Sequence, residues 1–342
     1  IERPVTLAEP STTPATPWPP FSALIRGTWF SPAVALSPTT WPWTGCYEPP
    51  AALPWCPAAE HPAVLEPVRD SGGVVVSTDT AGRVDHDRLA DTLGALADIA
   101  LVSVMTANNE TGVVNDVSAV AEIVAAHAPR AVVHTDAVQA TAWLDLAAAC
   151  RGAHLVSITG HKFGGPKGAG ALVLRAEVPL TPTIRGGGQE RERRGGTQNV
   201  AAAVGLGEAA RLVATERAAT AERIGRLRDR LEVGLIDRVP DTRRTVPDGT
   251  TRTPGIAHLC FAGVESEALL FLLEQEGIAA SAASSCASGA QEPSHVLAAM
   301  GIDREVARGS LRLSLGHGST DAEVDHALVV VPAAVDRLRE HA

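Results

Sequence analysis

The sequence predicts an α/β fold with a mainly parallel central sheet, helices on both faces of that sheet, and a smaller C-terminal α+β domain. Three observations lead to this prediction. Short apolar runs alternate with helically spaced segments from residue 58 onward. A long helical pattern then covers residues 201–235. A second, shorter series of strand and helix patterns follows it.

The first series predicts a large domain over residues 58–220. Its apolar runs are rich in Val, Ile and Leu, which is typical of parallel strands buried on both faces. A helix is expected at 117–127, where apolar side chains recur at helical spacing. The expected strands are 100–105, 131–134, 154–158 and 170–174.

The second series predicts a small α+β domain over residues 221–342. It begins within the long pattern at 201–235, where Glu and Arg recur at helical spacing and indicate a connecting helix. The elements expected after it are strands at 256–261 and 310–315 and helices at 265–276 and 321–341.

Residues 1–57 differ in composition from the rest of the chain. They hold 13 of the 24 prolines and five of the six tryptophans, but no lysine and only five charged residues. Proline interrupts every helical or strand pattern there, and a disordered arm would have less Trp and more charge. Because Trp has one codon, the underlying codons can be tested in a shifted frame, in which residues 29–49 permit a string containing T-S-G-G-T-E-S-D-N. We hypothesise that residues 1–57 are an out-of-frame translation, and we do not expect them to fold natively.

Charge and composition exclude several classes of protein. The formal net charge is −10, which argues against a nucleic-acid-binding surface. No apolar run reaches the roughly 18 residues that a membrane span needs, and no secretory leader is visible. The five cysteines form no C-x-x-C pair and no metal-ligand spacing. We therefore expect a cytoplasmic protein that binds neither nucleic acid nor membrane.

The chain has only two lysines, Lys162 and Lys167, and both lie in the segment Gly-His-Lys-Phe-Gly-Gly-Pro-Lys-Gly. Arginine supplies the other cationic side chains, but it cannot replace lysine where a deprotonated amine must condense with a carbonyl group. Lys162 is therefore the candidate for a Schiff-base lysine. Lys167 is interpreted as a surface lysine in a Gly-rich turn.

Cys286 lies in a stretch of small residues, Ser-Ala-Ala-Ser-Ser-Cys-Ala-Ser-Gly-Ala. Such a loop cannot pack well, so its thiol is expected to be exposed and able to reach a substrate. Cys260, by contrast, falls within an apolar strand pattern and is expected to be buried.

Several polar segments follow predicted strands or lie in loops, where open α/β sheets place their ligands. Together with the Cys286 segment they resemble the cysteine desulfurases of the NifS/IscS type, in the class V aminotransferase group, over roughly the last five-sixths of the chain. The small-residue loop is similar to the branch of that family with a long cysteine loop. The matching segments are EHPAV, ANNETG, VHTDAVQ, SITGHKFGGPKG, RGGGQERERRGGTQN, SSCASGAQEPSHVL and SLRLSLG.

The resemblance implies a fold-type I transferase whose large domain binds pyridoxal 5′-phosphate. Lys162 would then be the Schiff-base lysine, and Asp136 would pair with the ring nitrogen so that the ring acts as an electron sink. Further cofactor contacts would come from His61, which stacks on the ring and shuttles protons, Gln139, Asn109, Thr159 and His161. Alone, Asp136 could equally be a helix N-cap and His61 a loop histidine. A metal site built from His61, His134 and His161 is disfavoured, because these residues lack ligand spacing.

The resemblance also implies roles beyond the cofactor. Thr197 would reach the phosphate group in a neighbouring subunit, which makes the protein a homodimer. Arg312 would pair with the carboxylate of the substrate, a bidentate task suited to guanidinium, although a strand-end salt bridge is the simpler interpretation. Cys286 would take sulfur from L-cysteine as a persulfide, leaving L-alanine. A sulfur-acceptor or scaffold protein would then receive it for iron–sulfur cluster or thio-cofactor assembly.

Other interpretations remain open. The chain could be a selenocysteine lyase or another class V aminotransferase, which would not need Cys286. It could also be a catalytically impaired relic, because the Gly-Gly-Thr-Glu phosphate loop of the family is missing from the sequence as written. The shifted frame of residues 29–49 restores that motif, which supports the frame hypothesis.

Overall fold

We describe a computed structural model of the chain, in which residues 29–30, 53–96, 98–175, 178, 180–282 and 294–341 are placed. Most of residues 1–52, including the phosphate-loop string of the shifted frame, lie outside the described residues. The segment 283–293, which contains Cys286, also lies outside them.

The central sheet has seven strands in the described part of the chain, in the spatial order β1-β7-β6-β5-β4-β2-β3. Neighbours from β3 through β2, β4 and β5 to β6 are parallel, whereas β7 is antiparallel to β6 and β1 is antiparallel to β7. The expected mainly parallel sheet is therefore confirmed. The strands are β1 (Trp29–Phe30), β2 (Leu53–Pro57), β3 (Val74–Val76), β4 (Ile99–Ser103), β5 (Val132–Asp136), β6 (Leu155–Thr159) and β7 (Gly170–Leu174).

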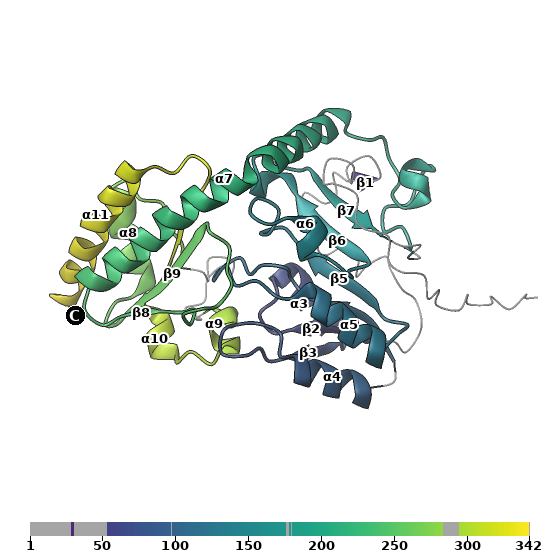
Figure 1. The fold of residues 1–342 in the computed structure, drawn as a ribbon, viewed down its shortest axis with the longest axis horizontal. Coiled ribbons are helices and arrows are strands. Elements are labelled where there is room, and N and C mark those ends of the chain that lie inside the picture. Colours follow the sequence, from purple (N-terminus) through teal and green to yellow (C-terminus); the bar gives the residue numbers. More distant parts are fainter. Residues whose placement is uncertain are drawn as a thin grey trace, which may run out of the picture.

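Helices lie on both faces of this sheet (Figure 1). Successive residues of β2 show this arrangement: the Trp55 side chain joins the core formed with α4 and α5, whereas Cys56 packs against α3. Asp85 and Asp116 cap α4 and α5 by accepting backbone N–H groups. The helical elements are α3 (Pro62–Asp70), α4 (His86–Ala95), α5 (Val117–His127), α6 (Leu146–Ala149), η3 (Gly160–Lys162) and η4 (Gln189–Glu192).

A single helix, α7 (Val200–Arg238), joins the two parts of the molecule (Figure 1). Leu206 in its first half packs in the core of the large sheet, and Leu231 in its second half packs in a separate core. That second core contains an antiparallel sheet in the order β10-β9-β8, which α8 and α11 cover. The elements after α7 are β8 (Thr242–Arg244), β9 (Ile256–Phe261), α8 (Ser266–Gln275), α9 (His295–Ala299), α10 (Arg304–Arg308), β10 (Ser310–Ser314) and α11 (Asp321–Arg339).

One expectation, that residues 1–57 do not fold with the rest of the chain, needs correction. Trp29–Phe30 pairs with β7 as strand β1, and Leu53–Pro57 forms strand β2 between β3 and β4. Two prolines lie in this strand, and the register with β4 shifts between Leu53 and Pro54, which accommodates the missing N–H of Pro54. The side chain of Trp55 is 1% exposed, so this part of the Pro- and Trp-rich segment contributes to the core.

No helix in the described ranges is long and apolar enough to cross a membrane.

Candidate active site

The carboxyl ends of β5 and β6 bring Asp136 and Lys162 to one edge of the central sheet. The two strands are parallel neighbours, with Asp136 opposite Ser157. Asp136 is the last residue of β5, and Lys162 ends the short turn η3 directly after β6. Asp136 is buried, and its Oδ1 accepts the backbone N–H of Val138 at 2.9 Å.

His61 lies within electrostatic range of Lys162. The Lys162 ammonium lowers the pKa of His61, after burial, and it also opposes the rise in the pKa of Asp136. Burial is the larger influence on Asp136 and raises its pKa to about 7. The predicted cluster of lysine, aspartate and histidine is therefore present. A second cation beside Asp136 would stabilise its ionised form further.

His61 is oriented by the helix that it starts. Its Nδ1 accepts the N–H of Ala63 at 3.1 Å, so the side chain acts as the N-cap of α3, and Pro62 occupies the first helical position. Burial, Lys162 and His295 all lower the pKa of His61. A neutral ring with Nδ1 accepting carries its proton on Nε2.

Thr159 and His161, for which the family resemblance implies a role in phosphate binding, lie together at the end of β6. The Oγ1 of Thr159 lies 3.1 Å from the Nδ1 of His161 and donates to the carbonyl of Ala169 at 3.3 Å. Gln139 is half-buried in the turn after β5, and Thr197 is exposed in the loop before α7.

Arg312 connects the small domain to this edge of the sheet. It lies on β10, and its Nη1 donates to the carbonyl of Asn109 at 2.9 Å. Two predicted site residues, one from each domain, are thus in direct contact. The neighbouring side chain of Glu110 is buried and accepts a hydrogen bond from the hydroxyl of Ser294.

The residues on both sides of segment 283–293 form hydrogen bonds with Arg312, Glu110 and Glu60. The backbone of Ser281 pairs with that of Arg312, with N···O distances of 3.1 and 2.8 Å. On the other flank, Ser294 contacts Glu110, and His295 contacts the carbonyl of Glu60 at 2.8 Å through Nε2. The chain on each side of Cys286 is therefore held beside the candidate site, although Cys286 itself is outside the described residues.

The other thiols within the described ranges are buried. Cys56, Cys150 and Cys260 are all fully enclosed, and burial raises the pKa of each, to about 12 for Cys150 and Cys260. The prediction that Cys260 is buried in its strand is confirmed. None of these three thiols is suited to act as a nucleophilic thiolate.

Sequence reasoning missed two buried carboxyl groups, Glu60 and Glu110. Glu60 is fully buried, its Oε1 accepts the N–H of Met105, and its Oε2 has no hydrogen-bond partner in the described part of the chain. Burial and then Asp136 raise the pKa of Glu60 well above its usual range, whereas the N–H of Met105 opposes this rise. Both residues stand next to predicted ligands in the quoted motifs, and only that adjacency could have indicated them.

His134 has a structural environment rather than a metal site. Its Nδ1 lies 2.7 Å from the Oγ of Ser103 and its Nε2 lies 2.9 Å from the Oγ of Ser157, so it links β4, β5 and β6. Burial lowers the pKa of His134 to about 3. No group of His, Cys, Asp and Glu suited to a metal ion occurs among the described residues.

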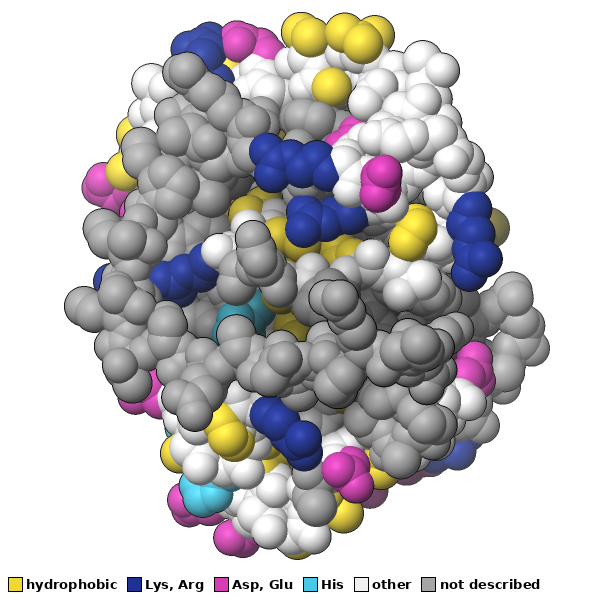
Figure 2. Space-filling view, turned by 90° about the vertical axis from the view of Figure 1, so that its right-hand side faces the viewer, with side chains coloured by type: hydrophobic (Ala, Val, Ile, Leu, Met, Phe, Trp, Pro, Cys, Tyr) yellow, Lys and Arg dark blue, Asp and Glu magenta, His cyan; other side chains and the backbone are white. Residues whose placement is uncertain are grey.

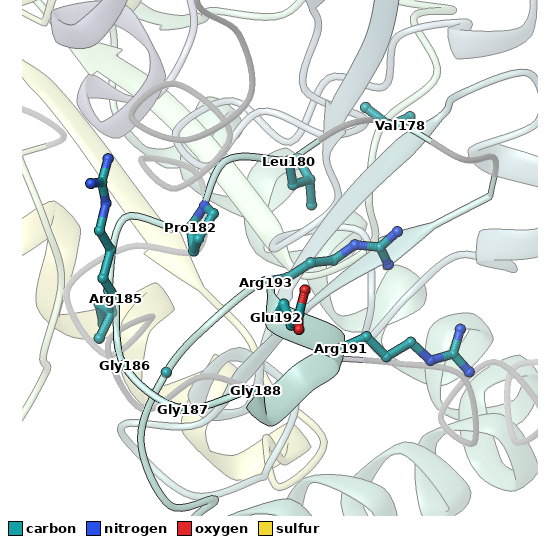
Figure 3. Close-up of a pocket in the computed structure, with 12 residues that line it drawn as sticks. Val178, Leu180, Pro182, Arg185, Gly186, Gly187, Gly188, Arg191, Glu192 and Arg193 are labelled. Carbon is teal, nitrogen blue, oxygen red and sulfur yellow. The ribbon is translucent and has the colours of Figure 1, made fainter.

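A pocket of about 600 Å³ lies in the loop between β7 and α7 (Figure 3). Arg185, Arg191, Arg193 and Glu192 line it, and none of the predicted site residues does. On the face shown in Figure 2, the described cationic side chains stand among acidic, apolar and uncharged ones rather than forming a continuous basic surface.

Comparison with known proteins points to one family. The family described as "Aminotransferase class-V" matches residues 56–327. An "IscS-like cysteine desulfurase" of Mycobacterium tuberculosis is 44% identical over 277 residues, which cover 80% of this chain and 70% of that protein. A "Cysteine desulfurase" of Gluconacetobacter diazotrophicus is 43% identical over 276 residues, covering 81% of this chain and 68% of that protein.

Solved structures show the same fold. A structure titled "NIFS-LIKE PROTEIN" aligns with a TM-score of 0.81 and 30% identity, covering 93% of this chain and 87% of that chain. The NifS-like protein of Rickettsia africae aligns with a TM-score of 0.78 and 25% identity, covering 94% and 88% of the two chains.

Proposed function

This chain belongs to the class-V aminotransferase family, and from that premise we infer that it is a pyridoxal-phosphate-dependent cysteine desulfurase that converts L-cysteine to L-alanine. The observation that carries this conclusion is the convergence of Lys162, Asp136 and His61 at one edge of the sheet, in a chain 44% identical to a cysteine desulfurase.

The described residues fit the cofactor at its ring end. Asp136 is a buried carboxyl group whose pKa burial raises to about 7, and it requires a cation nearby to ionise fully at neutral pH. The ring nitrogen of pyridoxal phosphate supplies such a cation. Lys162, on the neighbouring turn, is the amine that can bind the aldehyde group. Thr159 and His161 are the residues that would hold the phosphate group.

When bound, pyridoxal phosphate withdraws electrons from the α-carbon of an amino acid. The residues of this chain would perform the remaining tasks. Asp136 would hold the positive charge of the ring nitrogen. Lys162 would move the proton at the α-carbon of the substrate. Arg312 would bind the carboxylate of the substrate and so orient it.

We further propose that Cys286 is the sulfur acceptor. Its thiolate would attack the sulfur of the substrate, forming a new S–S bond as the C–S bond of the substrate breaks. The electron pair of the broken bond would stay with the substrate carbon, which would take up a proton to become the methyl group of L-alanine. The attachment of both flanking segments to Glu110, Glu60 and Arg312 supports this placement. Because Nδ1 of His61 already accepts a hydrogen bond, this ring would have to release the N-cap of α3 before it took the thiol proton there.

The oligomeric state, the partner protein and the cellular location are also proposals. We propose a homodimer in which Thr197 reaches the neighbouring subunit, since it is exposed and precedes α7. A separate sulfur-acceptor or scaffold protein would receive the sulfur. The three described thiols are unpaired, which is compatible with the reducing environment of the cytoplasm.

The visible spectrum of the purified chain, recorded before and after addition of L-cysteine, tests the function. A cofactor band that Lys162→Ala abolishes, together with formation of alanine and sulfide, is the expected result. Cys286→Ser should keep the band but lose desulfuration. Alanine formation at an unchanged rate in Cys286→Ser would contradict the role of the thiol, and a colourless wild-type protein would contradict the function. Sequencing of the coding DNA tests the frame hypothesis for residues 1–57 directly.

A further inference from the structure

Glu110 occupies a position that the reaction as described above does not explain. It follows Asn109 in a tight turn in which the side-chain oxygen of Asn108 accepts the N–H groups of Glu110 and Thr111, at 2.9 and 3.0 Å. The Nδ2 of Asn108 in turn donates to the carbonyl of Ala59 at 3.0 Å. This turn is therefore rigidly attached to the large domain.

Among the described residues, the side-chain donor to the carboxyl group of Glu110 is the hydroxyl of Ser294. That hydroxyl also accepts the N–H groups of Val296 and Leu297, at 3.1 and 3.3 Å, as the N-cap of α9. A serine hydroxyl carries a single proton. Because both acceptor interactions are used by α9, the hydroxyl proton is directed at Glu110.

Arg312 approaches the same turn from β10. It donates to the carbonyl of Asn109, the residue directly before Glu110, at 2.9 Å. Burial raises the pKa of Glu110 to about 7, and the hydroxyl of Ser294 and then the guanidinium of Arg312 oppose this rise by favouring the ionised form. Arg312 is also the residue assigned to the carboxylate of the substrate. The guanidinium that would receive the carboxylate of an amino acid therefore contacts the residue directly before this buried carboxyl group.

The other side of Arg312 carries no second cation among the described groups. His258 faces it across the β9–β10 pair. Thr245 Oγ1 donates to the carbonyl of His258 at 2.9 Å and lies 2.9 Å from Nδ1, so Nδ1 carries the ring proton and Nε2 does not. Burial lowers the pKa of His258 to about 3, which keeps the ring neutral.

We propose that Glu110 is a positioning residue that acts as the internal counter-ion of Arg312, competes with the carboxylate of the bound amino acid, and thereby weakens the binding of both L-cysteine and L-alanine. L-Alanine has the same carboxylate as the substrate, so weaker binding of that carboxylate would speed release of the product. This inference rests on the proposed function, since it assumes that an amino acid binds at Arg312.

The test compares Glu110→Gln with wild type in the cofactor-loaded protein. Glutamine keeps an oxygen that can accept from Ser294 but removes the charge. Binding of L-alanine and of 2-aminoethanethiol, which lacks a carboxylate, is followed by the change in the visible spectrum. We expect Glu110→Gln to tighten L-alanine binding by about three- to tenfold, the range for a partly screened charge interaction. Binding of 2-aminoethanethiol should stay unchanged.

Glu232→Gln is the matched control. Glu232 is also buried, but it pairs with Arg252 in the small domain, so its loss tests the general effect of removing a buried carboxylate. It should leave the L-alanine titration at its wild-type value. Unchanged or weaker L-alanine binding in Glu110→Gln, or equal tightening of both ligands, would overturn the proposal.

A second measurement separates this inference from the function. In the cofactor-free chain, the difference in infrared carboxyl bands between wild type and Glu110→Gln identifies Glu110. The substitution Arg312→Gln should move the titration midpoint of Glu110 to higher pH, because it removes the cation that stabilises the ionised form of Glu110. The influences on the pKa of Glu110 are burial, the hydroxyl of Ser294 before α9 and the guanidinium of Arg312 on β10, and Arg312 also helps to lower the pKa of His258. An unmoved midpoint would refute the coupling, even in a protein that fails to bind pyridoxal phosphate.

Discussion

Replacement of Asp136 by Asn should make the cofactor-free chain more resistant to alkaline conditions while it impairs the enzyme. Burial raises the pKa of Asp136 from 3.8 to about 7 in the folded chain. A carboxyl group with a raised folded pKa is most favourable below its unfolded pKa, and it loses stability as the pH rises toward the folded value. The shift of about 3 units corresponds to about 4 kcal/mol, of which about 2.5 kcal/mol is lost between pH 5 and pH 8.

Urea unfolding of the cofactor-free protein at several pH values measures this effect. The free energy of unfolding of wild type should fall between pH 5 and pH 8 by about 2.5 kcal/mol more than that of Asp136→Asn. Asp91→Asn, which changes an exposed aspartate of α4, should keep the wild-type pH dependence. Parallel pH profiles for wild type and Asp136→Asn would refute the reasoning. The cofactor-loaded Asp136→Asn protein should meanwhile lose most of its activity, because no carboxylate remains for the ring nitrogen.

Three further predictions concern the surroundings of the site. Ser294→Ala should lower the free energy of unfolding, measured in urea, by about 2–4 kcal/mol, since it removes an N-cap and leaves buried Glu110 without the hydroxyl donor of Ser294. The control Thr320→Ala, which removes only an exposed cap, should cost about 1 kcal/mol. Equal costs for the two variants would contradict the argument from burial. Arg312→Lys should raise KM for L-cysteine about tenfold with a smaller change in kcat, because the bidentate geometry and the bond to Asn109 are lost; an unchanged KM in steady-state kinetics would count against carboxylate binding there. The free energy of unfolding should decrease as the pH falls from 6.5 toward about 3, because His134 is buried in its neutral form. His134→Asn should reduce this decrease. An unaltered dependence of the free energy of unfolding on pH would argue against a neutral His134.

Much of the fold follows from local patterns in the sequence. The strands Gly170–Leu174 and Ile256–Phe261 and the helix Val117–His127 have the predicted bounds, because the strands are short, nearly continuous apolar runs and the helix repeats its apolar residues at helical spacing. The long helix extends only a few residues beyond its predicted ends. In each of these elements the local pattern and the tertiary burial favour the same structure.

Strand β2 could not be predicted from such a pattern. Leu-Pro-Trp-Cys-Pro contains two prolines, which argue against a central strand, yet β3 and β4 pair with it on either side. The deciding influence is tertiary: the sheet needs a strand between β3 and β4, and the shift beside Pro54 makes that pairing possible.

The candidate site was likewise predictable from the sequence only in part. Lys162, Asp136 and His61 were accessible from residue type and motif, and the structure brings them within electrostatic range. The hydrogen bond between Ser294 and Glu110 joins residues 184 positions apart. Nothing in either local segment specifies such a contact, because it depends on how α9 docks against the large domain. Thr197 and Cys286 remain predictions.

The continuous helix α7 also has a mechanical consequence. Its 39 residues correspond to a rod of about 58 Å, with one end embedded in each core. Neither half of the molecule can swing freely about a flexible tether, so relative motion of the two must bend this rod or slide along its packed faces. Thermal melting should accordingly be cooperative across both halves, and a glycine pair placed midway along the rod should split it into two steps.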